Sequence, residues 1–378
     1  MSSHPVSLAR FTPAFAIACL AVSSPSTHAQ DSIAIYGLLD AYLASVKGSA
    51  AGVNALDKRT HKIDSGGMTT SRFGIHGTED LGDGLYASFE LSSFIRLDTG
   101  ASGRSDATGN LKADPFWSRE ASVSLGNKSL GRIRLGNFST AMWEQSIATN
   151  AFGGSTVFAP INLLMFVGSP LSGGSGWANQ IELESATVDG FSIGGAVSAA
   201  EGQGGRNIEG HGSYTNGSAS TSFAWQSVKK NPVSFADGNS SNNTVAWQWA
   251  ASYDLKFAKV YGHLGRIVNK GTETLPMRAI FKVSEVSMSV PIGRAAVLIG
   301  WGRRGTDDPV LPVPPTAPGG NLARTIFSLG CDYSLSKRTD LYAVAIHDRT
   351  TTALVRPPSD GGAEARSTTL GLGIRHRF

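Results

Sequence analysis

The chain has 378 residues, of which 41% are hydrophobic and 16% charged, with 45 glycines and two cysteines. This length suits two or three ordinary domains or one large β-domain. Two cysteines exclude a disulfide scaffold and a zinc site built on cysteine pairs, and the hydrophobic content argues against disorder. The sequence lacks the run of about 18 apolar residues that a membrane-spanning helix needs. A net charge of +4 weakly favours anionic partners and does not indicate nucleic acid.

Residues 1–29 are predicted to be a secretory signal peptide. Arg10 is their only charged residue, an apolar run follows at 11–22, and Ala29 provides a small residue for cleavage. The apolar run is too short to span a membrane as a helix. A disordered tail and lipidation at Cys19 are the alternatives. Cleavage after Ala29 leaves residues 30–378 as one domain, with Cys331 as its single cysteine.

Residues 30–378 alternate between apolar and polar residues with a period of two, which is typical of β-strands. The apolar parity includes Ile33, Ile35, Phe73, Ile75, Phe89, Ile133, Leu135, Ile181 and Leu183. Short polar turns such as 80–84 alternate with long Gly/Ser/Pro segments such as 99–115. This rhythm favours an outer-membrane barrel, in which the apolar parity faces lipid and the polar parity faces a water-filled lumen. The breaks predict an all-β, antiparallel transmembrane barrel of about 16 strands.

Five segments in the same order resemble the trimeric general porins of Gram-negative bacteria, most closely the β-proteobacterial and neisserial branch. They are residues 35–41 (IYGLLDA), 71–82 (SRFGIHGTEDLG), 118–121 (SREA), 333–343 (YSLSKRTDLYA) and 373–378 (GIRHRF). The resemblance implies a homotrimer of barrels with short periplasmic turns and long extracellular loops. It also implies that the third extracellular loop, here 139–176, folds into the lumen and narrows it. Glu144 is the only charged residue of that loop.

Charged residues on the polar parity are the candidates for lining the pore, since opposed basic and acidic side chains set ion selectivity at a narrow point. The alternative for each is a solvated lumen charge away from the constriction. Arg72 also matches an arginine of the family. The basic candidates are Arg72, His76, Arg132, Arg134, Arg375 and Arg377, and the acidic ones are Glu90, Glu182 and Glu184, with Glu144 on the loop.

Arg119 matches a second family arginine, but it shares its parity with Ala121 and Val123. Simple alternation therefore places Arg119 on the outer face, unless a bulge resets the register. Asn137 and Glu182 stand where the family often carries arginine. Because both departures remove positive charge, the sequence predicts at most a weak anion preference.

The final strand ends in Phe378, and its resemblance to the family implies an assembly signal read by the barrel-insertion machinery. The alternative for Phe378 is an ordinary aromatic residue of the membrane interface. On composition, Trp247, Trp249, Tyr253 and Tyr342 are candidates for that interface.

The predicted function is passive diffusion of ions and small hydrophilic solutes through a channel embedded in outer-membrane lipid. No catalytic residue, cofactor site or metal site is predicted, because the sequence contains no Gly-x-Ser-x-Gly elbow, His-Glu-x-x-His motif or phosphate loop. Three alternatives stay open. They are a substrate-selective porin, a plugged barrel with a structural or surface-recognition role, and a barrel hydrolase that pairs a serine with a histidine.

Overall fold

The computed structural model describes residues 32–49, 59–104, 113–167, 172–201, 205–229, 243–271, 276–306, 321–352 and 363–378. The predicted signal peptide with its cleavage site after Ala29, together with Cys19, lies outside these residues. Among the residues described, no helix has the length and apolar character needed to cross a membrane.

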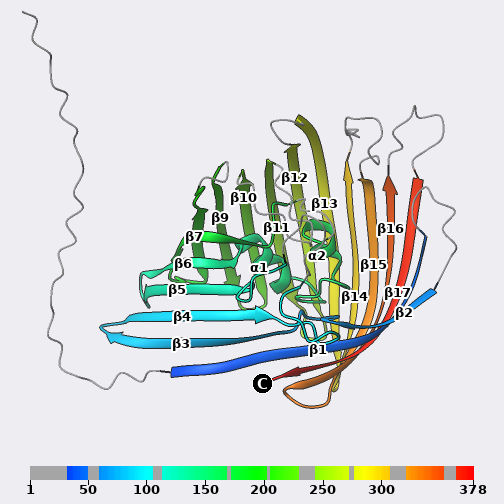
Figure 1. Cartoon of the computed structure of the whole chain (residues 1–378), viewed down its shortest axis with the longest axis horizontal. Helices are drawn as coiled ribbons and strands as arrows, with labels where there is room; N and C mark the ends of the chain where they lie inside the picture. The colour runs from blue at the N-terminus through cyan, green and yellow to red at the C-terminus, as the bar shows by residue number, and fades with distance from the viewer. Residues whose placement is uncertain are drawn as a thin grey trace, which may run out of the picture.

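The described chain folds into β-strand segments that pair antiparallel with their neighbours in one continuous sheet (Figure 1). Two short helices lie in the connection between β6 and β7. The strands are β1 Ser32–Ser49, β2 Arg59–Ser65, β3 Arg72–Gly82, β4 Leu85–Phe94, β5 Glu120–Asn127, β6 Gly131–Ser139, β7 Gly176–Ser185, β8 Phe191–Ser198, β9 Asn207–Asn216, β10 Ala219–Val228, β11 Thr244–Asp254, β12 Lys259–Gly271, β13 Pro276–Ile292, β14 Ala295–Thr306, β15 Asn321–Ser334, β16 Thr339–Thr352 and β17 Ala363–Arg377.

The sheet closes into a barrel because β1 pairs with strands on both of its edges. One edge pairs with β17. The other edge pairs with β3 over its first half and with β2 over its second half. β2 and β3 therefore share one position around the barrel, and the 17 described segments fill 16 positions. This confirms the predicted strand number. Closure pairs the two edges of the described sheet. In lipid, a β-structure needs this closure because its backbone N–H and C=O groups have no water to bond.

The two parities face the sides that the alternation predicts. Apolar side chains of one parity are exposed on the outer surface, with Ile33 at 73% and Leu183 at 62% exposure. Polar side chains of the other parity, such as Ser92 and Gln226, are buried inside the barrel. Tight turns such as 83–84 and 128–130 join consecutive strands at one end of the barrel.

The third long connection, between β6 and β7, enters the barrel as the fold prediction requires. It contains α1 (Ala141–Ala148), which Thr140 caps by accepting a hydrogen bond from the Trp143 N–H, and α2 (Pro160–Met165). α1 packs against β9, β10 and β11, and α2 packs against β13, β14 and β15 (Figure 1). We call the described residues 140–167 and 172–175 the inserted segment. An apolar cluster fills the contact between this segment and the wall. Its members include Phe152, Phe158, Ile161, Leu164, Ile267 and Ile326.

Wall side chains hold the inserted segment by its backbone. Arg324 Nη1 donates to the Leu163 carbonyl at 2.8 Å, and Arg304 Nη1 donates to the Leu164 carbonyl at 2.7 Å. Ser328 Oγ donates to the Phe158 carbonyl at 2.7 Å. Farther along the wall, Glu209 Oε2 accepts the Ala141 N–H at 3.0 Å, and His263 Nε2 lies 2.6 Å from the Thr149 carbonyl. These bonds satisfy backbone groups that the short helices leave unpaired.

A buried carboxylate holds the break between β2 and β3. Asp40 of β1 accepts hydrogen bonds from the N–H groups of Gly67, Met68 and Thr69 at 2.8–3.1 Å. It also accepts one from the Tyr342 hydroxyl at 2.6 Å. Tyr342 is therefore inside the barrel with 4% exposure, so its assignment to the membrane interface is wrong. The break is tied in turn to the inserted segment, because Ser155 Oγ donates to the Gly67 carbonyl at 2.6 Å.

The last residue closes the seam between β1 and β17. Phe378 exchanges two backbone hydrogen bonds with Gly37, each 3.1 Å long. Its ring lies over Gly37, where a Cβ atom would come within 2.2 Å of the ring. A glycine at this position therefore makes room for the terminal aromatic ring.

Replacing Asp40 with alanine removes the acceptor for four donors at once. We expect Asp40→Ala to lower the free energy of unfolding by about 3 kcal/mol or more, because buried donors lose their charged partner. Tyr342→Phe removes a single bond and should cost about 1 kcal/mol. Urea titration of the protein refolded in detergent measures both changes. Equal costs for the two variants would contradict a shared anchoring role for Asp40.

Replacing Arg324 with alanine releases the α2 end of the inserted segment. We expect the backbone amides of residues 160–167 to exchange hydrogen about tenfold faster, which corresponds to a charged hydrogen bond of about 1.4 kcal/mol. Mass-resolved hydrogen–deuterium exchange measures this change. Arg349→Ala is the matched control, because Arg349 pairs with Glu364 at the exposed end of β16. Faster exchange in both variants, or in neither, would contradict the anchoring role.

Candidate functional site

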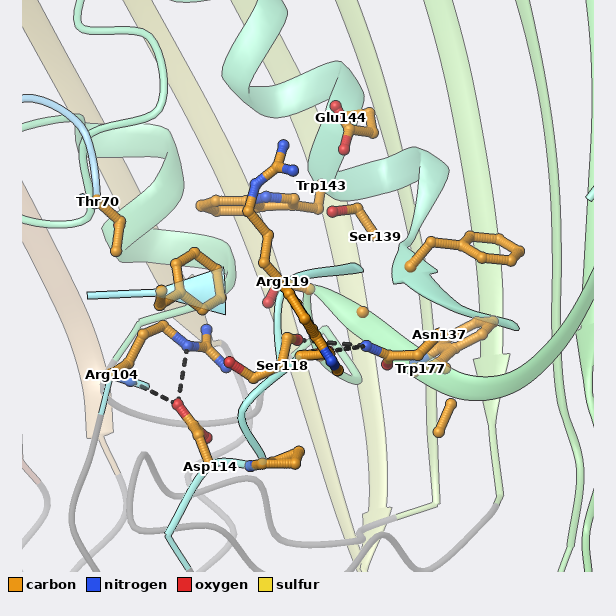
Figure 2. A pocket seen from close by; sticks show the side chains of 18 of the residues that line it. Thr70, Arg104, Asp114, Ser118, Arg119, Asn137, Ser139, Trp143, Glu144 and Trp177 are labelled. Carbon is orange, nitrogen blue, oxygen red and sulfur yellow. Dashed lines mark hydrogen bonds and ion pairs between the residues drawn. The ribbon is translucent and has the colours of Figure 1, made fainter. Parts of the chain in front are cut away.

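A cavity of about 490 Å³ lies between the inserted segment and the wall formed by β3–β7. Its position follows from the fold, because α1 and α2 pack against β9–β11 and β13–β15 and leave space on their other side. The lining comes mainly from the long-connection ends of β3, β4, β6 and β7, from residues 113–119 and from α1, and the ends of β8, β9 and β10 complete it. Figure 2 shows that these separate segments place their side chains around one hollow.

Arg72 and Glu144 bring opposite charges to this cavity. Arg72 is the first residue of β3, and its Nη1 donates a long hydrogen bond to the Thr70 carbonyl at 3.4 Å. Within the part of the chain that the structure describes, Arg72 forms no ion pair, and its buried Nε has no hydrogen-bond partner. Glu144 lies in the first turn of α1. The cavity thus has a basic group on the wall and an acidic group on the inserted segment.

Arg119 also lines the cavity, so the outward placement expected from simple alternation is wrong. Its Nη1 donates to Glu90 Oε1 at 3.1 Å and to Ser92 Oγ at 3.0 Å. The reason lies at the strand boundary. β5 begins only at Glu120, which itself points inward and pairs with Arg134 at 3.3 Å. Arg119 precedes the regular strand, so the period of two does not govern its direction.

The β6 arginines lie on the inner wall but pair with carboxylates away from the cavity. Arg134 donates to both oxygens of Glu182, with two contacts of 3.0 Å, and Arg132 lies 3.3 Å from the same carboxylate. Glu184 pairs with His211 at 2.6 Å. These predicted residues therefore form a compensated network rather than free pore charges.

The last strand carries a second compensated group. Arg375 contacts Asp332 at 2.7 Å and Asp340 at 3.0 Å, and Arg377 contacts Asp340 at 2.6 Å. His76 lies on the inner wall of β3, where its ring is 5.4 Å from that of Tyr36. Ten charged residues and histidines were expected to line the pore. Two of them, Arg72 and Glu144, line the cavity beside the inserted segment.

The alternation pattern did not reveal several residues of this site. Arg104 and Asp114 lie at the cavity, and the Asp114 carboxylate accepts the Arg104 backbone N–H at 2.7 Å (Figure 2). Trp117, Trp143 and Trp177 also line the cavity. Most of these residues stand in irregular segments or in α1, where a period of two has no meaning. Their clustering near strand ends was the only available signal.

Comparison with known proteins agrees with this architecture. A family model described as "Gram-negative porin" matches residues 16–353. An outer membrane porin protein of Bordetella pertussis is 28% identical over 96% of this chain and 98% of its own length. Outer membrane porin protein 32 of Delftia acidovorans is 27% identical over the same shares.

Solved structures share the fold. The anion-selective porin from Comamonas acidovorans superposes with a TM-score of 0.71, at 23% identity, over 92% of this chain and 100% of that chain. OmpT of Vibrio cholerae in its trimer form gives a TM-score of 0.62, at 14% identity, over 92% and 99% of the two chains. Because the family model covers most of the sequence, the chain belongs to the Gram-negative porin family.

Proposed function

We propose that this porin forms a water-filled channel in the outer membrane of a Gram-negative bacterium, through which ions and small hydrophilic solutes diffuse passively. The observation that carries the proposal is the cavity between the inserted segment and β3–β7, with Arg72 and Glu144 in its lining. An inserted segment that packs against one side of the barrel narrows the lumen and leaves a charge-lined passage along the other.

Fixed charges in such a passage act on ions at close range. The field between Arg72 on the wall and Glu144 on α1 attracts and orients charged solutes without any conformational step. Arg72 is uncompensated by an ion pair, whereas the other predicted arginines are held by carboxylates. We therefore infer a weak anion preference that depends on Arg72. The likeness to a porin described as anion-selective supports this direction.

We also propose that the channel assembles as a homotrimer. The support is the family membership and the trimer form of the similar Vibrio cholerae protein. Single-channel recording in a planar bilayer tests function and assembly together. We expect stepwise openings in groups of three and a reversal potential of the anionic sign under a salt gradient. A folded barrel without conductance would overturn the channel proposal.

Reversing the charge at Arg72 should reverse the effect of the wall on passing ions. A unit charge about 6 Å from an ion contributes roughly 0.7 kcal/mol in a water-like dielectric. We expect Arg72→Glu to lower the anion-to-cation permeability ratio at least about threefold in dilute salt, where screening is weakest. The reversal potential under a salt gradient measures this ratio.

Lys128→Glu provides the matched control for this charge reversal. Lys128 is exposed in the tight turn between β5 and β6, outside the cavity. The same change of charge at this position should leave the permeability ratio close to that of the unmodified protein. An equal shift in both variants would mean that net charge, and not the position of Arg72, determines selectivity.

We further propose that Phe378 acts in assembly through the barrel-insertion machinery. Its exposed ring at the seam between β1 and β17 supports a role at barrel closure. Deletion of Phe378 should lower the amount of folded porin in the outer membrane severalfold, as measured by heat-modifiable mobility of membrane fractions. Phe378→Tyr keeps the ring and should assemble well. Normal assembly of the deletion variant would contradict the proposal.

A further inference from the structure

We propose that the cavity beside Arg72 binds small aromatic monocarboxylates, whose ring lies among tryptophan side chains while the carboxylate meets the arginine. This inference rests on the proposed channel function and names a solute class for it. A cavity of about 490 Å³ is within the range that accepts small organic ligands.

The apolar part of the cavity is built from large aromatic side chains of separate elements. Phe94 comes from the end of β4, Trp117 from the segment before β5, Trp143 from α1 and Trp177 from the start of β7. Figure 2 shows Trp143 and Trp177 around the same hollow as Arg104 and Arg119. Hydrated inorganic ions gain little from indole surfaces, whereas a planar ring gains both apolar burial and ring–ring contact.

Neighbouring contacts fix the orientation of these rings. Trp177 donates its indole N–H to the Gly173 carbonyl at 2.9 Å. Trp143 packs edge-on against Phe166 at a centroid distance of 5.0 Å, and Trp117 packs against Phe116 at 4.7 Å. Rings held in this way lose little conformational freedom when a ligand binds between them.

Arg72 supplies the group that a carboxylate needs. Its buried Nε lacks a hydrogen-bond partner, and Nη1 makes a single long bond to the Thr70 carbonyl. The Nε atom is too buried to meet a ligand, so the terminal Nη groups supply the planar pair of donors that suits two parallel bonds with one carboxylate. Arg119, by contrast, already bonds Glu90 and Ser92. Arg104 lies 3.6 Å from Asp114.

The balance of charge favours a monoanion over a dicarboxylate. Arg72 forms no ion pair within the described chain, while Arg104 and Arg119 each lie within 3.6 Å of a carboxylate oxygen. Glu144, which also lines the cavity, disfavours a second negative group on the ligand. The negative faces of the indole rings disfavour an anion directly over them, so the carboxylate is directed to Arg72 and the ring to the tryptophans.

The test measures interruption of potassium chloride current through single channels by benzoate and by acetate. Both anions carry one carboxylate, but only benzoate has a ring. We expect millimolar benzoate to interrupt the current in a concentration-dependent manner and acetate to have no such effect. Trp143→Ala should weaken the interruption about three- to tenfold, which corresponds to the loss of one ring–ring contact. Trp143→Phe, which keeps an aromatic ring, should restore most of it.

Trp249→Ala is the matched control, because Trp249 is 44% exposed on the outer face of β11. This variant should conduct and bind benzoate as the unmodified protein does. Equal effects of benzoate and acetate, or no effect of Trp143→Ala, would overturn the proposal. Interruption by benzyltrimethylammonium instead of benzoate would overturn it in favour of a cation cage. Absence of any potassium chloride current would mark failure of the channel function itself.

Discussion

The attachment of the inserted segment to one side of the lumen determines where everything else in this porin can act. Side chains from β9 to β15 bond the backbone of the inserted segment directly. Because short helices leave many backbone groups unpaired, the segment is stable inside the barrel only where the wall supplies partners. The cavity lies on the other side of the inserted segment, where the ends of β3, β4, β6 and β7 supply most of the wall.

The same attachment gives the barrel an apolar core in an unusual place. A porin strand ordinarily carries polar residues on its inner face. Here the inner positions of β12 to β16 include Ile267, Val283, Leu298, Ile326 and Val344, all of which are buried against or near the inserted segment. These strands therefore carry apolar side chains on both faces at the places where the inserted segment packs against them. The apolar side chains fill the interface between the wall and the inserted segment. The hydrogen bonds fix the position of the segment's backbone along the wall.

This arrangement explains which features could be predicted from the sequence. Alternation assigns the faces correctly where the inner wall carries polar side chains, as at Ile181 and Glu182 of β7. The alternation pattern carries less information where the inner wall packs against the inserted segment. Tyr342, with Val344 and Ile346 on the same inner face, looks like an outward residue by composition but bonds Asp40 inside. The predicted direction of Arg119 is wrong for a different reason, because this residue lies one position before β5 begins. Trp117 and Trp143 belong to segments without strand periodicity, and Trp177 lies at the start of β7, beside an irregularity in its pairing with β6.

The pairing of charges also explains why a count of arginines does not give the selectivity of the channel. Four arginines lie on the inner wall, and each is within 3.3 Å of a carboxylate oxygen. They are Arg132, Arg134, Arg375 and Arg377. A compensated pair has little field at a distance, especially in salt. Arg72 differs because it forms no ion pair among the described residues and lines the same cavity as several aromatic side chains. One arginine without an ion pair attracts anions only weakly as a class. The aromatic side chains beside it favour those anions that carry a planar ring. Selectivity for a solute class can therefore coexist with a nearly neutral lumen.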